Sequence, residues 1–429
     1  MTPAGRSGLR FLYRATGLTR VAAFKRRAAR SGFALARARC LDGEGFFHTR
    51  SHDLSWEPRE NAELPPKQSL APFMALIRSV LTLSFCASAA LSTPGFAADS
   101  ISGAGSSAAA PVYKIWAAEY AKAKGTTLDY APVGSGAGMT KIYKHEVDFG
   151  ASDVIASAAD LKKNDLVMFP TVITGVVPVV NVAKIGQGQL HLTGDVLGRI
   201  FVGQITQWDA PEIKALNPGL KLPNHAIRLV ARADGSGTTY HFSDYLSRTS
   251  AAWKAKYGVA SHFDWPAGTL AVKGSGEIAK TVLATEDSIG YIDYNYVIDD
   301  ELTGVAMKNA DGQFVAASVE GFHQAVMHST WYSVGDFSTE INDLPGTGTW
   351  PITMGTYVAV PRVAVAGDRA ERTLRFLTWA YLHGDSLARQ AKFVPLPERV
   401  QASAYREISR VMSQSGESLG AKTMSNLVE

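Results

Sequence analysis

The chain of 429 residues is very poor in cysteine, and it has no apolar run as long as the roughly 20 residues that span a bilayer. Its only cysteines are Cys40 and Cys86, so the sequence after residue 97 has none. Their absence there excludes a disulfide framework, a thiolate nucleophile and a cysteine zinc site from most of the chain. We expect a protein that does not itself span a membrane.

The sequence also lacks the motifs of common hydrolases and nucleotide-binding proteins. His145 and Glu146 do not continue into the His-Glu-x-x-His spacing of a zinc site. The glycines at 134–138 lack both the Lys-Ser/Thr ending of a P-loop and the dinucleotide-binding spacing, and no Gly-x-Ser-x-Gly elbow has an identifiable histidine partner. The eight histidines after residue 97 are scattered. We therefore expect no catalytic residue, no metal and no cofactor.

Positive charge is concentrated at the start of the chain. Residues 1–97 hold 14 Lys or Arg against 6 Asp or Glu, so they carry +8, whereas the remainder carries −4. A mildly acidic main portion argues against nucleic-acid binding. Hydrophobic residues make up 46% and charged residues 19% of the chain, which is typical of a globular protein large enough for two lobes.

Residues 74–97 have the layout of an export signal. Met74 and Arg78 precede an apolar stretch at 79–91, and small residues at 95 and 97 favour cleavage after Ala97. The alternative is a buried core helix. Residues 1–73 are rich in arginine and show no sustained apolar period, so we interpret them either as a disordered basic extension or as a mis-called start upstream of Met74.

From residue 98 onward, strand-like and helix-like patterns alternate, which predicts an α/β fold. We expect strands at 127–133, 147–153, 169–181, 227–231, 288–294 and 350–360, and helices at 110–124, 139–144, 238–248 and 372–382. Ser107 is a candidate cap for the first helix and Gly125 its terminator.

The apolar run at 169–181 is too continuous to be half exposed, so this strand should cross the middle of the molecule. The strand at 350–360 could cross beside it. The sequence then predicts a discontinuous lobe I, residues 98–174 and 355–429, with lobe II, residues 175–354, inserted in it.

Three short segments are small and rich in hydroxyls, at residues 103–107, 134–138 and 232–238. Each follows an expected strand and precedes an expected helix, where exposed amides attract negative charge. If they converge, they form a cage of amide and hydroxyl donors, and Arg232 adds a forked cation to it. The alternatives are ordinary turns and, for Arg232, a surface salt bridge beside a capped helix.

Asp153 is expected at the end of the strand at 147–153. An ionised carboxylate only accepts hydrogen bonds, so it repels an anion unless that anion supplies a proton. A protonated phosphate has such a proton, whereas sulfate at neutral pH does not. If Asp153 lies in the cage, the sequence predicts a phosphate ligand, with discrimination of about 10³-fold or more. The alternative is a surface cap.

Taken together, these segments resemble the periplasmic phosphate-binding protein of the bacterial ABC-type phosphate uptake system. The similarity runs from about Ser100 to the C-terminal region. Its most specific pieces are residues 103–105, 147–153, 169–173, 216–220 and 232–238.

The resemblance implies an α/β, two-lobed periplasmic-binding-protein fold (venus-flytrap, type II) with two hinge-crossing strands. By motif position it implies that Asp234 orients Arg232 and that phosphate is bound by Ser107, Ala108, Ser135, Asp153, Arg232, Ser236, Gly237 and Thr238. Ala108 and Ala109 replace a phenylalanine and a proline that are common in the family, and the contact implied there is made by a backbone amide.

We expect a periplasmic, monomeric receptor that makes and breaks no bond. Its partners would be inorganic phosphate and the permease subunits of an ABC importer with a cytoplasmic ATPase. Two alternatives are a secreted phosphate-ester hydrolase on the same scaffold and a secreted scavenger without a transporter.

Overall fold

The computed structural model describes residues 100–425. The predicted export signal at 74–97 and both interpretations of residues 1–73 lie outside the described residues. None of the helices between residues 100 and 425 combines the length and the apolar character that crossing a bilayer requires.

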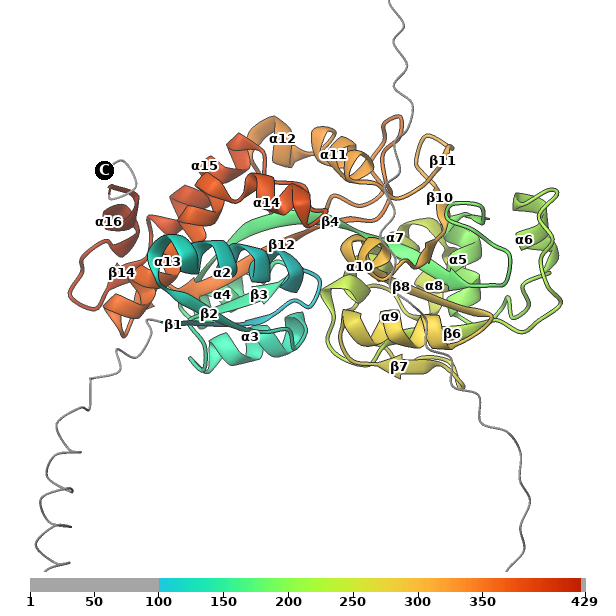
Figure 1. Cartoon of the computed structure of the whole chain (residues 1–429), viewed down its shortest axis with the longest axis horizontal. Coiled ribbons are helices and arrows are strands. Elements are labelled where there is room, and N and C mark those ends of the chain that lie inside the picture. Colours follow the sequence, from blue (N-terminus) through green and yellow to red (C-terminus); the bar gives the residue numbers. More distant parts are fainter. Residues whose placement is uncertain (1–99, 426–429) are drawn as a thin grey trace, which may run out of the picture. The chain divides into compact units, whose positions relative to one another are not determined.

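One long mixed sheet runs through the described part of the chain (Figure 1), with the strand order β2-β1-β3-β12-β4-β8-β6-β7 and β9 paired beside β4. Its strands are β1 (Ser100–Gly105), β2 (Thr127–Ala131), β3 (Phe149–Ser152), β4 (Leu166–Asn181), β6 (Arg228–Arg232), β7 (Leu270–Val272), β8 (Ser288–Asp293), β9 (Thr303–Gly304) and β12 (Thr353–Pro361). Strand β1 is parallel to β2 and β3, and β6 is parallel to β7 and β8.

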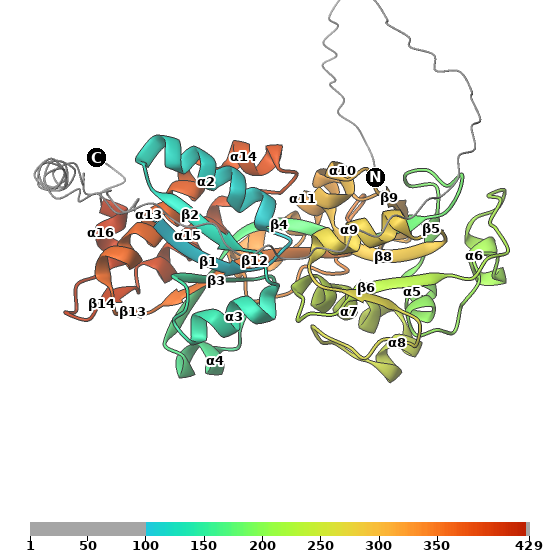
Figure 2. The same ribbon diagram turned by 60° about the horizontal axis from the view of Figure 1, so that its bottom comes forward.

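Strand β4 joins the two groups of parallel strands. Its first part, as far as Gly175, pairs antiparallel with β12, and its last six residues, from Val176, pair antiparallel with β8. Almost every residue of β4 is buried, as its continuous apolar sequence predicts. In Figures 1 and 2, β4 and β12 run between the group with β1–β3 and the group with β6 and β8. The predicted lobe boundaries after residues 174 and 354 stay a prediction.

Helices cover both groups of strands: α3 packs on β1 and β3, α2 on β2, α9 on β6 and β8, and α7 on β8. The helices are α2 (Ala110–Lys124), α3 (Ser135–Tyr143), α4 (Ala158–Lys163), α5 (Gly194–Phe201), α6 (Pro211–Leu216), α7 (Gly237–Thr249), α8 (Ala251–Lys256), α9 (Ser275–Ala284), α10 (Tyr294–Asp299), α11 (Val319–Met327), α12 (Thr330–Val334), α13 (Gly367–His383), α14 (Asp385–Gln390), α15 (Glu398–Ile408) and α16 (Leu419–Ser425). Two small sheets contain β5 (His191–Leu192), β10 (Ala306–Lys308) and β11 (Phe314–Val315), and β13 (Val363–Ala364) and β14 (Met412–Ser413).

The predicted α/β alternation is confirmed, and helix α2 has the predicted bounds. It ends at Gly125 in the left-handed conformation, also as predicted. The prediction that Ser107 caps this helix is wrong, because the N-cap residue is Ala109. The backbone N–H of Ala109 donates to the Oγ of Ser106 at 3.2 Å.

Helix α3 begins at Ser135, four residues earlier than predicted, so the glycine-rich run is mostly helix and not loop. Gly134 makes the turn with a φ of 89°, which favours glycine. Gly138 lets the helix approach β1 closely, since a Cβ there would lie 2.3 Å from the Cα of Gly105. The packing of Gly138 against β1 therefore outweighs the low helix propensity of the glycine-rich run.

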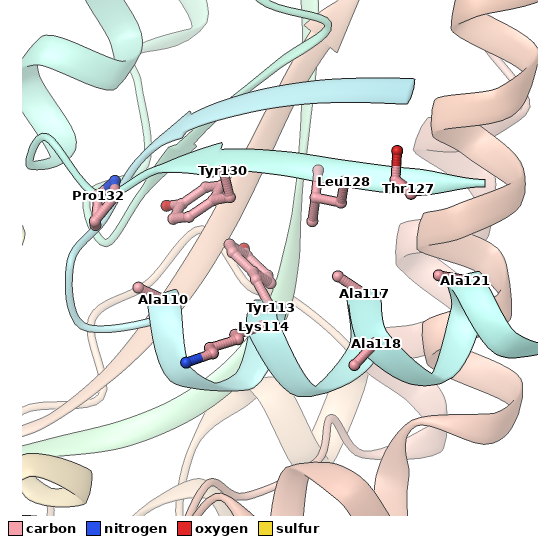
Figure 3. Close-up of a pocket in the computed structure, with 10 residues that line it drawn as sticks. All are labelled: Ala110, Tyr113, Lys114, Ala117, Ala118, Ala121, Thr127, Leu128, Tyr130 and Pro132. Atoms are coloured by element: carbon pink, nitrogen blue, oxygen red, sulfur yellow. The ribbon is translucent and has the colours of Figure 1, made fainter. Parts of the chain in front are cut away.

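A hollow of about 450 Å³ lies between α2 and the edge strand β2 (Figure 3), and its lining includes Ala117, Leu128, Tyr113 and Tyr130. The two tyrosine rings meet edge to face with centroids 4.9 Å apart. Tyr130 also donates from its hydroxyl to the backbone oxygen of Ser106 at 2.8 Å. The aromatic packing beside the hollow thus supports the turn that follows β1.

Candidate functional site

The candidate site lies at the carboxyl ends of strands from both groups. Strand β1 ends at Gly105, and β3 delivers Asp153 directly after Ser152. In the other group, β6 ends at Arg232 and β8 at Asp293. Parallel neighbours end at the same edge of a sheet, where ligands of open α/β sheets bind.

The structure brings the three predicted segments together, which confirms their convergence. The backbone N–H of Gly136 donates to the oxygen of Gly235 at 3.0 Å. Gly237 lies so close to the opposite group that a Cβ there would be 2.4 Å from the Cβ of Asp153 and 2.8 Å from the Oγ of Ser135. Segments far apart in the sequence therefore surround one place, which we call the cage.

Asp153 is buried within the cage, with 2% of its surface exposed, so the alternative of a surface cap is wrong. Its Oδ1 accepts from the Oγ of Ser106 at 2.6 Å and from the Oγ1 of Thr356 at 2.7 Å, and its Oδ2 accepts from the Oγ of Ser135 at 3.2 Å. The carboxylate thus faces three hydroxyl groups.

Arg232 is also buried, so the alternative of a surface salt bridge is wrong. Its Nε and Nη2 form a forked pair with the two carboxylate oxygens of Asp234, at 2.7 and 2.6 Å, and its Nη1 donates to the Oγ of Ser275 at 3.3 Å. Burial acts to lower the pKa of Arg232, but the hydrogen bonds and charge of Asp234, together with Asp293 and Tyr291, hold that pKa above its ordinary value. Burial likewise acts to raise the pKa of Asp234, and Arg232 outweighs it and lowers that pKa.

The remaining predicted residues lie in or next to the segments that meet at the cage. Ala108 is fully buried just before α2 and offers only its backbone. Ser236 caps α7, because its Oγ accepts from the backbone N–H of Thr239 at 3.2 Å. Gly237 and Thr238 form the first turn of α7, where backbone N–H groups have no partner within the helix and attract negative charge. The Oγ of Ser107 lies 2.9 Å from that of Ser275.

The sequence prediction missed four polar residues of the cage: Ser106, Ser275, Asp293 and Thr356. Asp293 shows the same signal as Asp153, a carboxylate at the end of an apolar strand, and could have been found by it. Ser106 stands in a predicted segment. Thr356 lies in the middle of β12, and nothing in its local sequence distinguishes it.

His241 ties the two groups of strands together. It is buried in the second turn of α7, and its Nε2 lies 2.6 Å from the backbone oxygen of Asp153. A carbonyl only accepts, so Nε2 carries the hydrogen. Its Nδ1 lies 3.3 Å from the Oε2 of Glu340.

The cage can therefore hold a small oxyanion with many donors and can also accept a proton-bearing oxygen. It offers hydroxyls, helix starts and one partnered arginine, beside the carboxylates of Asp153 and Asp293. Between residues 100 and 425, no group of three or more His, Cys, Asp or Glu side chains is placed to hold a metal ion.

Comparisons with known proteins place the chain in a family. A family model described as a PBP superfamily domain matches residues 91–368. The phosphate-binding protein PstS of Xylella fastidiosa (strain Temecula1) is 39% identical over 307 residues, which are 71% of this chain and 84% of the relative. The phosphate-binding protein PstS of Haemophilus influenzae is 38% identical over 303 residues, which are 71% of this chain and 90% of the relative.

Solved structures share the fold. A high-affinity periplasmic phosphate-binding protein bound with phosphate, PfluDING, is 20% identical with a TM-score of 0.55, over 72% of this chain and 93% of that one. A phosphate-binding protein from Stenotrophomonas maltophilia is 19% identical with a TM-score of 0.55, over 76% of this chain and 98% of that one. The described residues thus have the fold of two-lobed binding proteins, as the sequence predicts.

Proposed function

The chain belongs to the PBP superfamily and to the PstS family of phosphate-binding proteins, and from this premise we propose that it binds inorganic phosphate in the cage. The family is one of binding receptors and not of enzymes. We propose further that the protein works in the periplasm and delivers phosphate to the permease subunits of an ABC importer with a cytoplasmic ATPase.

The single observation that carries this proposal is the position of Asp153. Its buried carboxylate faces the cage in the company of three hydroxyl donors. A fully ionised oxyanion would meet this carboxylate as acceptor against acceptor, which costs several kcal/mol. A phosphate that still carries a proton donates a hydrogen bond to Asp153, and the hydroxyls turn toward its other oxygens.

We propose that phosphate contacts the predicted set, Ser107, Ala108, Ser135, Asp153, Arg232, Ser236, Gly237 and Thr238. Hydroxyls and backbone N–H groups donate to the phosphate oxygens, and Arg232 offsets part of the ligand's charge. Asp234 holds the guanidinium in place through the forked pair. The oxygens are thereby separated from water on most sides.

We propose that binding is coupled to the approach of two lobes, with lobe I at 98–174 and 355–429 and lobe II at 175–354. The contact of Gly136 with Gly235 and that of His241 with Asp153 would form only when the lobes are closed. A ligand favours the closed state to the extent that it binds it more tightly. The protein would act as a monomer.

The proposal is tested by isothermal titration of ligand-free protein with phosphate and with sulfate. We expect one phosphate per chain and a preference over sulfate of about 10³-fold or more. An Asp153→Asn variant offers an amide donor in place of one carboxylate oxygen, so the preference should shrink to about tenfold or less.

Asp129→Ala is the matched control, because Asp129 is exposed on β2 and its replacement should leave the preference unchanged. Failure of the unmodified protein to bind phosphate would overturn the proposed function. Unchanged discrimination in Asp153→Asn would overturn only the role of Asp153. None of the relatives above is named as a hydrolase, and we do not propose that activity.

A further inference from the structure

Asp293 is a second carboxylate in the cage, and it is completely buried. It stands at the end of β8 and is the N-cap residue of α10, yet its side chain accepts no capping bond from that helix. Instead its Oδ2 accepts from the Oγ of Ser275 at 2.6 Å and its Oδ1 from the Oγ1 of Thr238 at 2.9 Å. The carboxylate therefore faces the cage and not the helix that it precedes.

These two hydroxyls connect Asp293 to proposed phosphate contacts. Thr238 is one of those contacts itself. Ser275 gives its only hydroxyl hydrogen to Asp293, so in its 2.9 Å contact with Ser107 the hydroxyl of Ser107 must be the donor. Both hydroxyl hydrogens, those of Thr238 and Ser107, are thus directed away from a ligand while Asp293 is ionised.

No salt bridge to Asp293 exists among the described residues, and the charges that act on it are few. They are Asp153, which repels its charge, and Arg232, which attracts it but is paired with Asp234. Tyr296 of α10 is uncharged, because burial and the charge of Asp293 raise the pKa of its phenol. On the surrounding helices, Glu277 and Lys280 of α9 pair with each other, and Asp244 of α7 pairs with Arg248. His241 of α7 faces Glu340 and the backbone of Asp153.

The surroundings of Asp293 disfavour its charge. Burial, followed by the charge of Asp153, raises the pKa of Asp293 from 3.8 to about 6, although Ser275, Arg232 and Thr238 act in the opposite direction. A phosphate anion in the cage adds another negative charge close by, which favours the neutral acid further. A group that binds its proton more tightly in the complex takes up a proton on binding.

A proton on Asp293 would also reverse the hydrogen bonds around it. A neutral carboxyl group donates one hydrogen bond, to the Oγ1 of Thr238 or to the Oγ of Ser275. In the first case the hydrogen of Thr238 is free for a phosphate oxygen. In the second, Ser275 donates to Ser107 and the hydrogen of Ser107 becomes free. Each proton taken from solvent therefore makes one hydroxyl donor available to the ligand.

We propose that Asp293 takes up a proton when phosphate enters the cage, so that the affinity for phosphate falls as the pH rises through and above neutrality. This inference rests on the proposed function and adds a second residue that sets the affinity of the same site. Asp153 accepts a hydrogen bond from the ligand, whereas Asp293 binds a proton from solvent, which redirects the neighbouring hydroxyls toward the ligand.

The test is to titrate phosphate into the full chain and into an Asp293→Asn variant at several values between about pH 6 and pH 9. The asparagine keeps an acceptor and a donor but never carries charge. Phosphate changes its own ionisation over this range equally for both proteins, so the informative quantity is the ratio of their Kd values. We expect the Kd of the unmodified protein, divided by that of the variant, to rise at least about tenfold from pH 6 to pH 8.

Asp300→Asn is the matched control, since Asp300 is exposed at the end of the same helix α10. The Kd of the unmodified protein divided by that of Asp300→Asn should not change with pH. A Ser275→Ala variant provides a second measurement if Asp293→Asn does not fold. It removes a hydrogen-bond donor that lowers the pKa of Asp293, so that pKa should rise further. The fall in phosphate affinity should therefore occur at higher pH. The inference is overturned if the ratio of Kd values for Asp293→Asn stays constant with pH. It is also overturned if the pH dependence of Kd in Ser275→Ala is the same as in the unmodified protein. Absence of phosphate binding by the unmodified protein at every pH overturns the proposed function instead.

Discussion

The charged residues of the cage differ in which neighbouring groups stabilise their charge. Arg232 and Asp234 hold each other in a forked, partly buried pair, and each keeps its charge because of the other. Asp153 is supported by three hydroxyls and Asp293 by two, with no cation in direct contact with either among residues 100–425. For Asp293, burial without a cation in contact makes the group a source of pH dependence.

Asp293 should make the free protein less stable as the pH rises. Its pKa is about 6 in the folded chain and near 3.8 in the unfolded chain, so the folded state binds the extra proton between these values and loses stability as the pH rises through them. Replacing Asp293 with Asn should therefore raise the free energy of unfolding at pH 7.5 by about 1–3 kcal/mol and change it much less near pH 4. Urea unfolding at the two pH values, without phosphate, measures this. An equal effect at both would contradict it.

At the scale of elements, the cage is made by helix starts that are pressed against strand ends. Helix α3 packs on β1 through Gly138, and the start of α7 packs against Asp153 through Gly237. Glycine is needed at both positions for space and not for its backbone freedom, since neither has a positive φ. A methyl group at Gly138 would push α3 away from β1, and one at Gly237 would push α7 away from Asp153.

A Gly237→Ala variant tests this close approach. The new Cβ would lie 2.4 Å from the Cβ of Asp153, so the start of α7 could not reach β3. We expect the affinity for phosphate to fall by about a hundredfold or more, which corresponds to the roughly 3 kcal/mol typical of a forced shift in a packed site. Titration calorimetry gives the affinity, and circular dichroism should show an intact fold.

Gly136→Ala is the matched control, because its Cβ would lie 3.4 Å from Gly235, an ordinary contact. It should bind phosphate within about threefold of the unmodified protein. Similar affinities for both variants would show that the two elements do not need to meet for binding.

At the scale of the whole described chain, β12 pairs with β3 and β4 pairs with β8, so these two adjacent strands link the two groups. The cage exists only where the groups also touch beyond these strands, as they do between Gly136 and Gly235 and between His241 and Asp153. His241 makes one of these contacts, with the backbone oxygen of Asp153.

Replacing His241 with Leu should weaken phosphate binding without changing selectivity. The variant loses the donor to the backbone oxygen of Asp153, and a lost hydrogen bond of this kind costs about 1 kcal/mol. We expect the Kd for phosphate to rise about five- to tenfold while the preference over sulfate persists. His323→Leu, at an exposed position on α11, serves as the control. An unchanged Kd for His241→Leu would show that the contact does not contribute to closure.

The sequence by itself determined the local structure and the chemistry of individual groups. Continuous apolar runs predict buried strands such as β4, glycine at 125 ends α2, and Asp153 and Arg232 stand where strands end. These features depend on neighbouring residues, so they can be inferred from short windows. The predicted start of α3 is too late, because glycine has a low helix propensity and a short window does not show the packing that outweighs it.

Only the tertiary structure decided which groups share the cage and in what state. Thr356 reaches Asp153 from a strand 203 positions away, and Ser275 links Ser107, Arg232 and Asp293 across three elements. The burial and the repulsion by Asp153 that raise the pKa of Asp293 likewise come from residues distant in the sequence. Hydrogen bonds and electrostatic interactions depend on distance in space, and that distance is set by the pairing of whole strands and not by any local pattern.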